Sequence, residues 1–159
     1  MKKGSMAWLA LGAVASIVAT GCSSGSMSKG LGGADAVADR QRLMKSVGAN
    51  WKEVQDKFKA GNVEGVAVNA EVLAIHATQV TQYFPKGSMT AASKAKPEIW
   101  EKWADFEKAA KNLETESIKL REAAKTKNAA ATEAVLKDFG RNACGACHTP
   151  FRVPPPRQG

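Results

Sequence analysis

The sequence predicts an all-α protein whose folded part, residues 35–152, forms an antiparallel up-down-up-down bundle of four helices. Four segments each place apolar residues three and four positions apart, which is the spacing of an amphipathic helix. Short stretches that contain Gly, Pro or Asn separate these segments, so consecutive helices should lie antiparallel. The chain contains no run of alternating β-branched residues, and strands are therefore not expected.

The first 21 residues have the pattern of an export signal. Lys2 and Lys3 precede a 15-residue apolar run, 6–20, which suits a signal-peptide core and is short for a membrane span. The run ends in 19–22, Ala-Thr-Gly-Cys, which resembles the lipobox of bacterial lipoproteins. Lipidation of Cys22 would tether the protein to the membrane, and plain secretion after nearby cleavage is the alternative. We therefore expect the mature protein in the periplasm, with no later membrane-spanning segment.

Residues 22–34 are rich in Ser and Gly and should form a flexible tether. Asp35 is a suitable N-cap for the first helix, which should end at 60–61, Ala-Gly. Asn62 should cap the second helix, and the segment Phe84–Ser88, which contains Pro and Gly, should end it.

A loop to Lys96 should lead into the third helix, with Pro97 in the first turn, where proline is tolerated. This helix should fray near 126–128. The fourth helix should start at Asn128 and continue into the cysteine motif. Residues 153–159, which contain three consecutive prolines, should form an extended tail.

The formal net charge is +8, and residues 1–21 account for two lysines and no acid, so the remainder carries +6. A mild positive charge favours acidic partners. A nucleic-acid-binding protein would more typically show a basic stripe with exposed aromatic residues or a known motif, and neither occurs here.

The motif Cys144–His148, with sequence Cys-Gly-Ala-Cys-His, predicts covalent attachment of one haem c. Two thiols three positions apart on a helix can add to the two vinyl groups of a haem. The adjacent His148 can then place its imidazole on the iron as an axial ligand.

Cys144 and Cys147 have three alternative interpretations. A thioredoxin-like redox pair would need a βαβ context, which this chain lacks. A structural zinc site would need a fourth ligand, for which only His76 and Cys22 remain. A disulfide that closes so small a loop would stabilise little and would leave His148 unexplained.

The chain resembles the cytochrome c′ family, the class II c-type cytochromes, over residues 35–152. The resemblance includes Arg40 and Gln41 in the first helix, the break Phe84–Ser88, the segment Ala95–Trp100, and Phe151–Arg152 after the haem histidine. It implies a four-helix bundle with one covalent haem and no enzymatic activity. The expected function is that of a periplasmic haem protein.

The resemblance also singles out Met44, four residues after Arg40. In low-spin relatives of the cytochrome c-556 type, a methionine at this position is the second axial ligand of the iron, so we expect a one-electron carrier with His148 and Met44 on the iron. A soft thioether raises the potential and suits electron transfer. The alternative is a five-coordinate, high-spin cytochrome c′ that binds NO or CO, with Met44 as a core residue that fills a gap.

By the same resemblance, Arg40 would pair with a haem propionate, and Trp100 and Arg152 would contact the haem. A charged residue at the edge of the stripe is the alternative for Arg40, and Pro150 leaves the placement of Arg152 open. Trp100 is otherwise a core residue. His76 reads as a partly exposed helical histidine, with a role as a rival axial ligand less expected.

No acid follows Asp138, whereas Arg141, Arg152 and Arg157 do. These cations predict a docking surface for an acidic redox partner near the haem, or they compensate the haem propionates. Family members often pair through their first two helices, so a homodimer is a further expectation.

Overall fold

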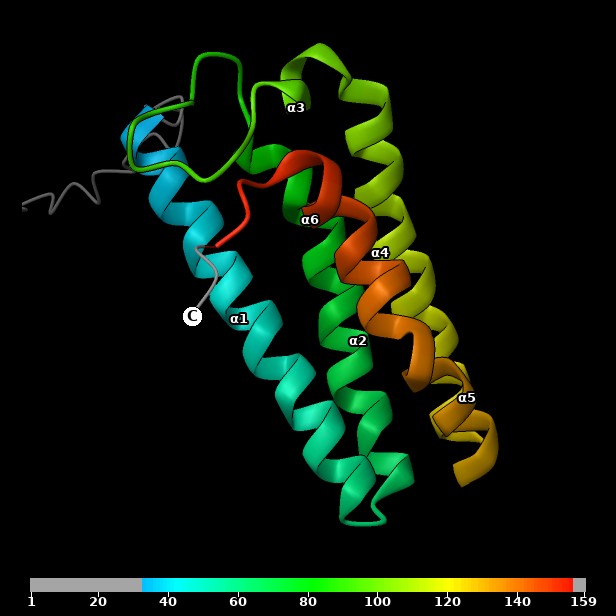
Figure 1. The fold of residues 1–159 in the computed structure, drawn as a ribbon. Helices are drawn as coiled ribbons and strands as arrows, with labels where there is room; N and C mark the ends of the chain where they lie inside the picture. Colours follow the sequence, from blue (N-terminus) through cyan, green and yellow to red (C-terminus); the bar gives the residue numbers. More distant parts are fainter. Residues whose placement is uncertain (1–32, 156–159) are drawn as a thin grey trace, which may run out of the picture.

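The computed structural model describes residues 33–155, and every element within that range is helical (Figure 1). The signal peptide 1–21, the lipidation site Cys22, most of the tether 22–34 and the end of the tail lie outside the described residues. The elements are α1 Gly33–Lys59, α2 Val63–Gln79, the 3-10 helix η1 Val80–Tyr83, α3 Glu98–Glu101, α4 Trp103–Lys125, α5 Ala129–Phe139, the π-helical turn η2 Gly140–Gly145 and α6 Ala146–Phe151.

The four predicted segments form the antiparallel four-helix bundle, which confirms the predicted fold class. The central pair is α2 and α4, and α1 packs mainly against α2. Helix α5, η2 and α6 follow one another along α4 as a single interrupted fourth helix (Figure 1). Helices α1 and α2 meet at the tight turn after Lys59 and diverge toward the other end of the bundle (Figure 1). That end carries α6.

Two asparagine caps lie where the sequence predicts them. The Asn62 side chain accepts a hydrogen bond from Gly65 N at 2.9 Å, and the Asn128 side chain accepts one from Ala131 N at 3.1 Å. Each satisfies a backbone donor that the first helical turn leaves free. Gly61 precedes the first cap with φ of +76°, a conformation that costs glycine nothing.

The third and fourth helices are both interrupted, which the apolar spacing does not reveal. Lys102 leaves the helical conformation, with φ −119° and ψ 51°, so the third segment is a single turn, α3, followed by α4. Pro97 lies at the N-cap of α3, one position before its first helical residue. In the fourth segment, π-helical geometry starts at Gly140 and includes Cys144. Such turns add a residue and rotate the side chains that follow, and they occur often at functional sites.

The core consists of two clusters, one on each side of Met44. The larger cluster joins α1, α2, α4 and α5, and in it Trp51 stacks on Phe139 with ring centroids 4.6 Å apart. The smaller cluster lies at the α6 end and is centred on the buried Phe106, which contacts Phe84 and Phe151 edge-on. The half-buried Met44 packs against both clusters.

The C-terminal segment turns back onto the loop before α3. Lys96 N donates to Phe151 O at 2.9 Å and Val153 N donates to Lys94 O at 2.8 Å, which forms an isolated bridge between Ala95 and Arg152. Arg152 is extended, and the structure assigns no helix to residues 153–155. Among the described helices, none combines the length and the apolar character needed to cross a membrane.

Candidate haem site

A cavity of about 470 Å³ lies between α1, the loop before α3, α4 and α6, and the second half of the cysteine motif opens into it. Cys147 and His148 line it from α6, and Arg40 and Met44 line it from α1. Its volume falls in the range of sites that take a cofactor-sized ligand. Residues that the sequence separates by about a hundred positions thus share one cavity.

The cysteine motif has the protonation states that haem attachment and ligation use. Burial raises the pKa of the Cys147 thiol to about 11, with the nearby Cys144 as a smaller cause, and burial also raises the pKa of the Cys144 thiol. Burial and, secondarily, the charge of Arg152 lower the pKa of His148. At neutral pH both cysteines are therefore thiols, and the imidazole is neutral, which is the form that binds iron. Neither cysteine forms a disulfide.

Arg40 is a buried cation at the wall of the cavity. It is 6% exposed, and its Nη2 donates to Ser88 O at 2.6 Å and to Ser88 Oγ at 2.8 Å. Its Nε donates to Ala36 O at 3.2 Å, and its guanidinium carbon lies 4.5 Å from the centre of the Phe84 ring. None of these partners is an anion, and burial lowers the pKa of the guanidinium. A buried charge without a counter-ion is costly, so the site fits a ligand that brings negative charge.

The four charged residues that line the cavity are all cations: Arg40, Lys45, Lys94 and Arg152. No described carboxylate lines it. The haem brings two propionates, which match this surplus, and the thiols and the neutral imidazole match its vinyl groups and its iron. The residues present therefore fit a covalently bound haem. Among the described residues, no three metal-ligating side chains form a cluster, and Cys22 lies outside them.

The structure gathers most of the predicted site residues, with two exceptions. Trp100 lies behind Arg40 and donates from its Nε1 to Phe84 O and Pro85 O, both at 3.1 Å, but it does not line the cavity. Cys144 is half-buried beside the larger core cluster and is likewise absent from the lining. Their contacts with the haem stay predictions. Pro150 does not end α6, which runs to Phe151 and leaves Arg152 at the mouth of the cavity.

His76 lies away from this site. Its Nε2 is 2.8 Å from Ser46 Oγ, in the seam between α1 and α2, and it is half-buried, as predicted. The sequence reasoning missed Ser88 and Ser93, whose side chains bind Arg40, and Lys45 and Lys94 at the cavity mouth. The predicted break Phe84–Ser88 contains Ser88, but no spacing rule indicates which residue of this loop forms a hydrogen bond with α1.

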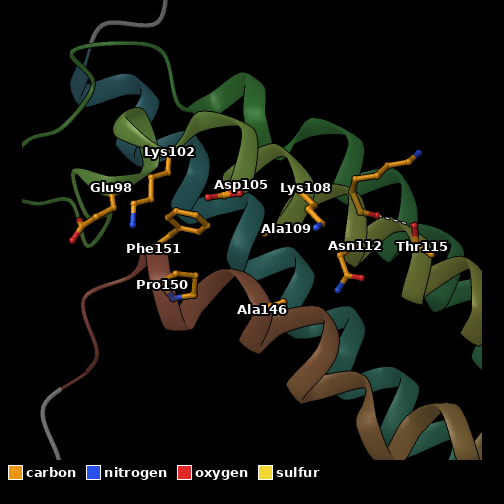
Figure 2. A pocket seen from close by; sticks show the side chains of 11 residues that line it. Glu98, Lys102, Asp105, Lys108, Ala109, Asn112, Thr115, Ala146, Pro150 and Phe151 are labelled. Carbon is orange, nitrogen blue, oxygen red and sulfur yellow. Dashed lines mark hydrogen bonds between the residues drawn. The ribbon is translucent and has the colours of Figure 1, made fainter.

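A second hollow, of about 850 Å³, lies on the opposite side of α6 (Figure 2). It is an open groove between α4 and α6, with Ala109, Ala146 and Phe151 among its lining residues. Lysines and acids alternate along its edge, with Glu98 and Asp105 beside Lys102 and Lys108 (Figure 2). It contains neither the cysteines nor His148, so it is distinct from the candidate haem site.

Comparison with known proteins gives one family. The model of the cytochrome c′ family matches residues 35–152. Cytochrome c′ from Thermochromatium tepidum is 27% identical, with a TM-score of 0.69 over 79% of this chain and 99% of that one. A carbon monoxide-bound variant of cytochrome c prime from Alcaligenes xylosoxidans is 25% identical, with a TM-score of 0.69 over 77% and 98%. Cytochrome c′ from Rubrivivax gelatinosus, 24% identical with a TM-score of 0.65 over 76% and 96%, shares the fold. No curated relative matches the sequence.

The matched family consists of periplasmic proteins that carry one covalent haem c. They transfer electrons or bind gases and are not classical enzymes, in agreement with the predicted absence of enzymatic activity. The matches do not single out the low-spin c-556 subtype to which Met44 pointed. Since the family model spans most of the chain, and Cys144 and Cys147 fit the attachment motif, this protein belongs to the cytochrome c′ family of class II c-type cytochromes and carries one covalent haem c.

Proposed function

We propose that this cytochrome binds a small neutral gas, nitric oxide or carbon monoxide, at a five-coordinate haem whose only protein ligand is His148. Three solved structures with which the chain aligns are nitric oxide or carbon monoxide complexes of single-residue variants of cytochrome c prime from Alcaligenes xylosoxidans, each at 25% identity. This is the alternative that the sequence left open. It takes precedence over the electron carrier because the comparisons favour it.

The observation that carries the proposal is the apolar lining that α1 and its neighbours contribute to the cavity. Val37 and Met44 from α1, Val80 from η1 and Phe106 from α4 line it together. These side chains offer no strong hydrogen bond, and a neutral diatomic molecule needs none. Met44 is already held by contacts with both core clusters, as expected of a methionine that fills a gap.

Five residues of the candidate haem site have a defined part in this function. Cys144 and Cys147 fix the haem by thioether bonds, each formed when a thiol adds across a vinyl group. His148 holds the iron, and Arg40, fixed by Ser88, offers its charge to a propionate. The haem supplies the iron centre that binds the gas.

One observation favours a second candidate, the electron carrier with both His148 and Met44 on the iron. Met44 lines the same cavity as His148, from the helix that faces α6. If Met44 occupied the sixth coordination position of the iron, the coordination of the iron would be similar in both oxidation states. This would favour electron transfer over gas binding.

The absorption spectrum of the oxidised protein separates the two candidates when it is compared with that of a Met44→Leu variant. Gas binding predicts a high-spin spectrum in both proteins. The carrier predicts a low-spin spectrum with a weak far-red methionine–iron band, and Met44→Leu would abolish both features. Met89→Leu is the matched control, because Met89 lies in the exposed loop before α3.

We further propose that Cys22 carries lipid after removal of residues 1–21 and tethers the domain to the membrane through residues 22–34. Mass spectrometry of the mature N-terminus tests this, since an unmodified Cys22 or a cleavage site beyond it would contradict it. A homodimer is also proposed, supported by two exposed apolar residues on α2, Val68 and Ile75. Sedimentation of the wild type against Val68→Glu/Ile75→Glu tests the dimer.

A further inference from the structure

The mouth of the haem cavity carries three exposed cations from three separate segments: Lys45 of α1, Lys94 of the loop before α3 and Arg152 after α6. We call them the mouth cations. No described carboxylate lies within ion-pair distance of any of them. Many other surface cations are neutralised by a neighbour, including Arg42 by Asp39 and Lys127 by Glu64. The positive charge at the mouth is thus locally uncompensated.

Arg141, which the sequence placed on the docking surface, differs in this respect. Its Nη2 lies 2.5 Å from Asp138 Oδ1, so it forms an ion pair within its own helix. Arg157 lies outside the described residues. Of the three C-terminal arginines, only Arg152 is shown to contribute unpaired charge beside the cavity.

The backbone holds two of the mouth cations in place. The bonds from Lys96 N to Phe151 O, 2.9 Å, and from Val153 N to Lys94 O, 2.8 Å, fix Lys94 and Arg152 on adjacent antiparallel segments. Lys45 lies on helix α1, directly after Met44 in the sequence. The mouth cations thus come from three segments to one opening, where they can complement an acidic surface.

The charge also exceeds what the haem needs. Arg40 and the three mouth cations give the cavity four positive charges. Two propionates balance two of them, which leaves a net positive rim around the opening to the haem. The groove on the other side of α6 has a smaller excess, because two acids face its three lysines and one of these lysines, Lys111, forms an ion pair with Glu114 (Figure 2).

We propose that the mouth cations form the docking surface for an acidic one-electron redox protein that reduces the haem. The partner gives up one electron, the ferric iron accepts it and becomes ferrous, and no proton or covalent bond is involved. The inference rests on the proposed function in that it requires the bound haem, but it does not depend on whether the iron has a sixth ligand. A gas binder needs ferrous iron to take carbon monoxide, and a carrier must be reduced once in every cycle.

The test is a stopped-flow measurement of reduction of the ferric holoprotein by a reduced flavodoxin, a small acidic redox protein. The variant Lys45→Glu/Lys94→Glu reverses two mouth cations. The matched control Lys59→Glu/Lys108→Glu reverses two exposed lysines that form no described ion pair, one at the far end of α1 and one at the edge of the groove between α4 and α6. Both variants have the same net charge and retain Cys144, Cys147, His148, Met44 and Arg40.

We expect the mouth variant to be reduced about ten-fold more slowly than the control at low ionic strength. The difference should vanish near 1 M salt, where the screening length is about 3 Å. Hexaammineruthenium(II), a small cationic reductant, should show the reverse order. Equal rates for the two variants with flavodoxin would overturn the docking surface.

The same rates for both variants, combined with Lys45- and Lys94-dependent binding to phosphatidylglycerol vesicles, would assign the charges to a membrane surface instead and would also overturn the proposal. Failure of the proposed function has a different signature. It would appear as a low-spin ferric spectrum, before any reductant is added.

Discussion

Replacing Ser88 by alanine should destabilise the protein by about 3 kcal/mol, although this residue touches neither cysteine nor His148. Ser88 is 1% exposed, and its hydroxyl makes two bonds. It accepts from Arg40 Nη2 at 2.8 Å and donates to Pro85 O at 2.7 Å. It thereby joins α1 to the loop that closes one end of the haem cavity.

The magnitude follows from these two bonds. A hydrogen bond to a charged group contributes about 1.5–3 kcal/mol, and a neutral one about 0.5–1.5 kcal/mol. Alanine at position 88 leaves no buried group without any partner, because Arg40 Nη2 keeps Ser88 O and Pro85 O keeps Trp100 Nε1. The penalty for an unpaired buried polar group is thus avoided, and about 3 kcal/mol is expected from the bonds alone.

The assay is urea unfolding of the ferric holoprotein, followed by helical circular dichroism. With a slope of about 2 kcal/mol per molar urea, the midpoint should fall by about 1.5 M and the slope should not change. Ser117→Ala is the matched control. Ser117 is equally buried, but its hydroxyl only donates to Leu113 O within its own helix, so its loss should cost less than about 1 kcal/mol. Equal midpoints for the two variants would refute the assigned role of Ser88.

Three further predictions concern the bundle and are checked by the same unfolding assay. Leu120→Ala should cost about 3 kcal/mol, because Leu120 is fully buried in the larger core cluster and alanine leaves a cavity; a loss below about 1 kcal/mol would place it outside the core. Asn128→Ala should cost about 1 kcal/mol through loss of the cap on Ala131 N, and Asn128→Ser should recover most of it. Arg121→Gln, which breaks the ion pair between α4 and Glu71 of α2, should cost less than about 1 kcal/mol at low salt and nothing measurable at high salt, since Glu71 is 44% exposed.

The sequence predicts the four helical segments well because their stabilising interactions are local or periodic. Asn62 and Asn128 cap helices through bonds to residues three positions away, and such bonds can be read from neighbouring letters. The break at Lys102 and the π-helical turn from Gly140 have no comparable local signal. Both depend on how α4 and the cysteine motif must turn to pack, which a spacing pattern does not encode.

The same difference between local signals and tertiary contacts decides which residues of the candidate site can be predicted from the sequence. Cys144, Cys147 and His148 are found from the sequence because the haem chemistry fixes their spacing. Arg40 and Met44 are predictable only through resemblance to the family, since a helical stripe alone does not distinguish a ligand from a core residue. Ser88 joins the site through its bond with Arg40 of α1, and Lys94 joins it through its backbone bond with Val153 of the C-terminal segment. Both contacts link residues that are far apart in the sequence, so only the tertiary structure reveals them.

In the proposed function, His148 alone holds the iron, and the opposite side of the haem, lined by Met44, is open to a gas. The most direct measurement is the absorption spectrum of the reduced protein before and after addition of carbon monoxide. With His148 as the only protein ligand, the ferrous spectrum should be high-spin, and its Soret band should shift and sharpen as the gas binds. A low-spin spectrum with sharp, separate α and β bands that carbon monoxide leaves unchanged would contradict it and would assign Met44 to the iron.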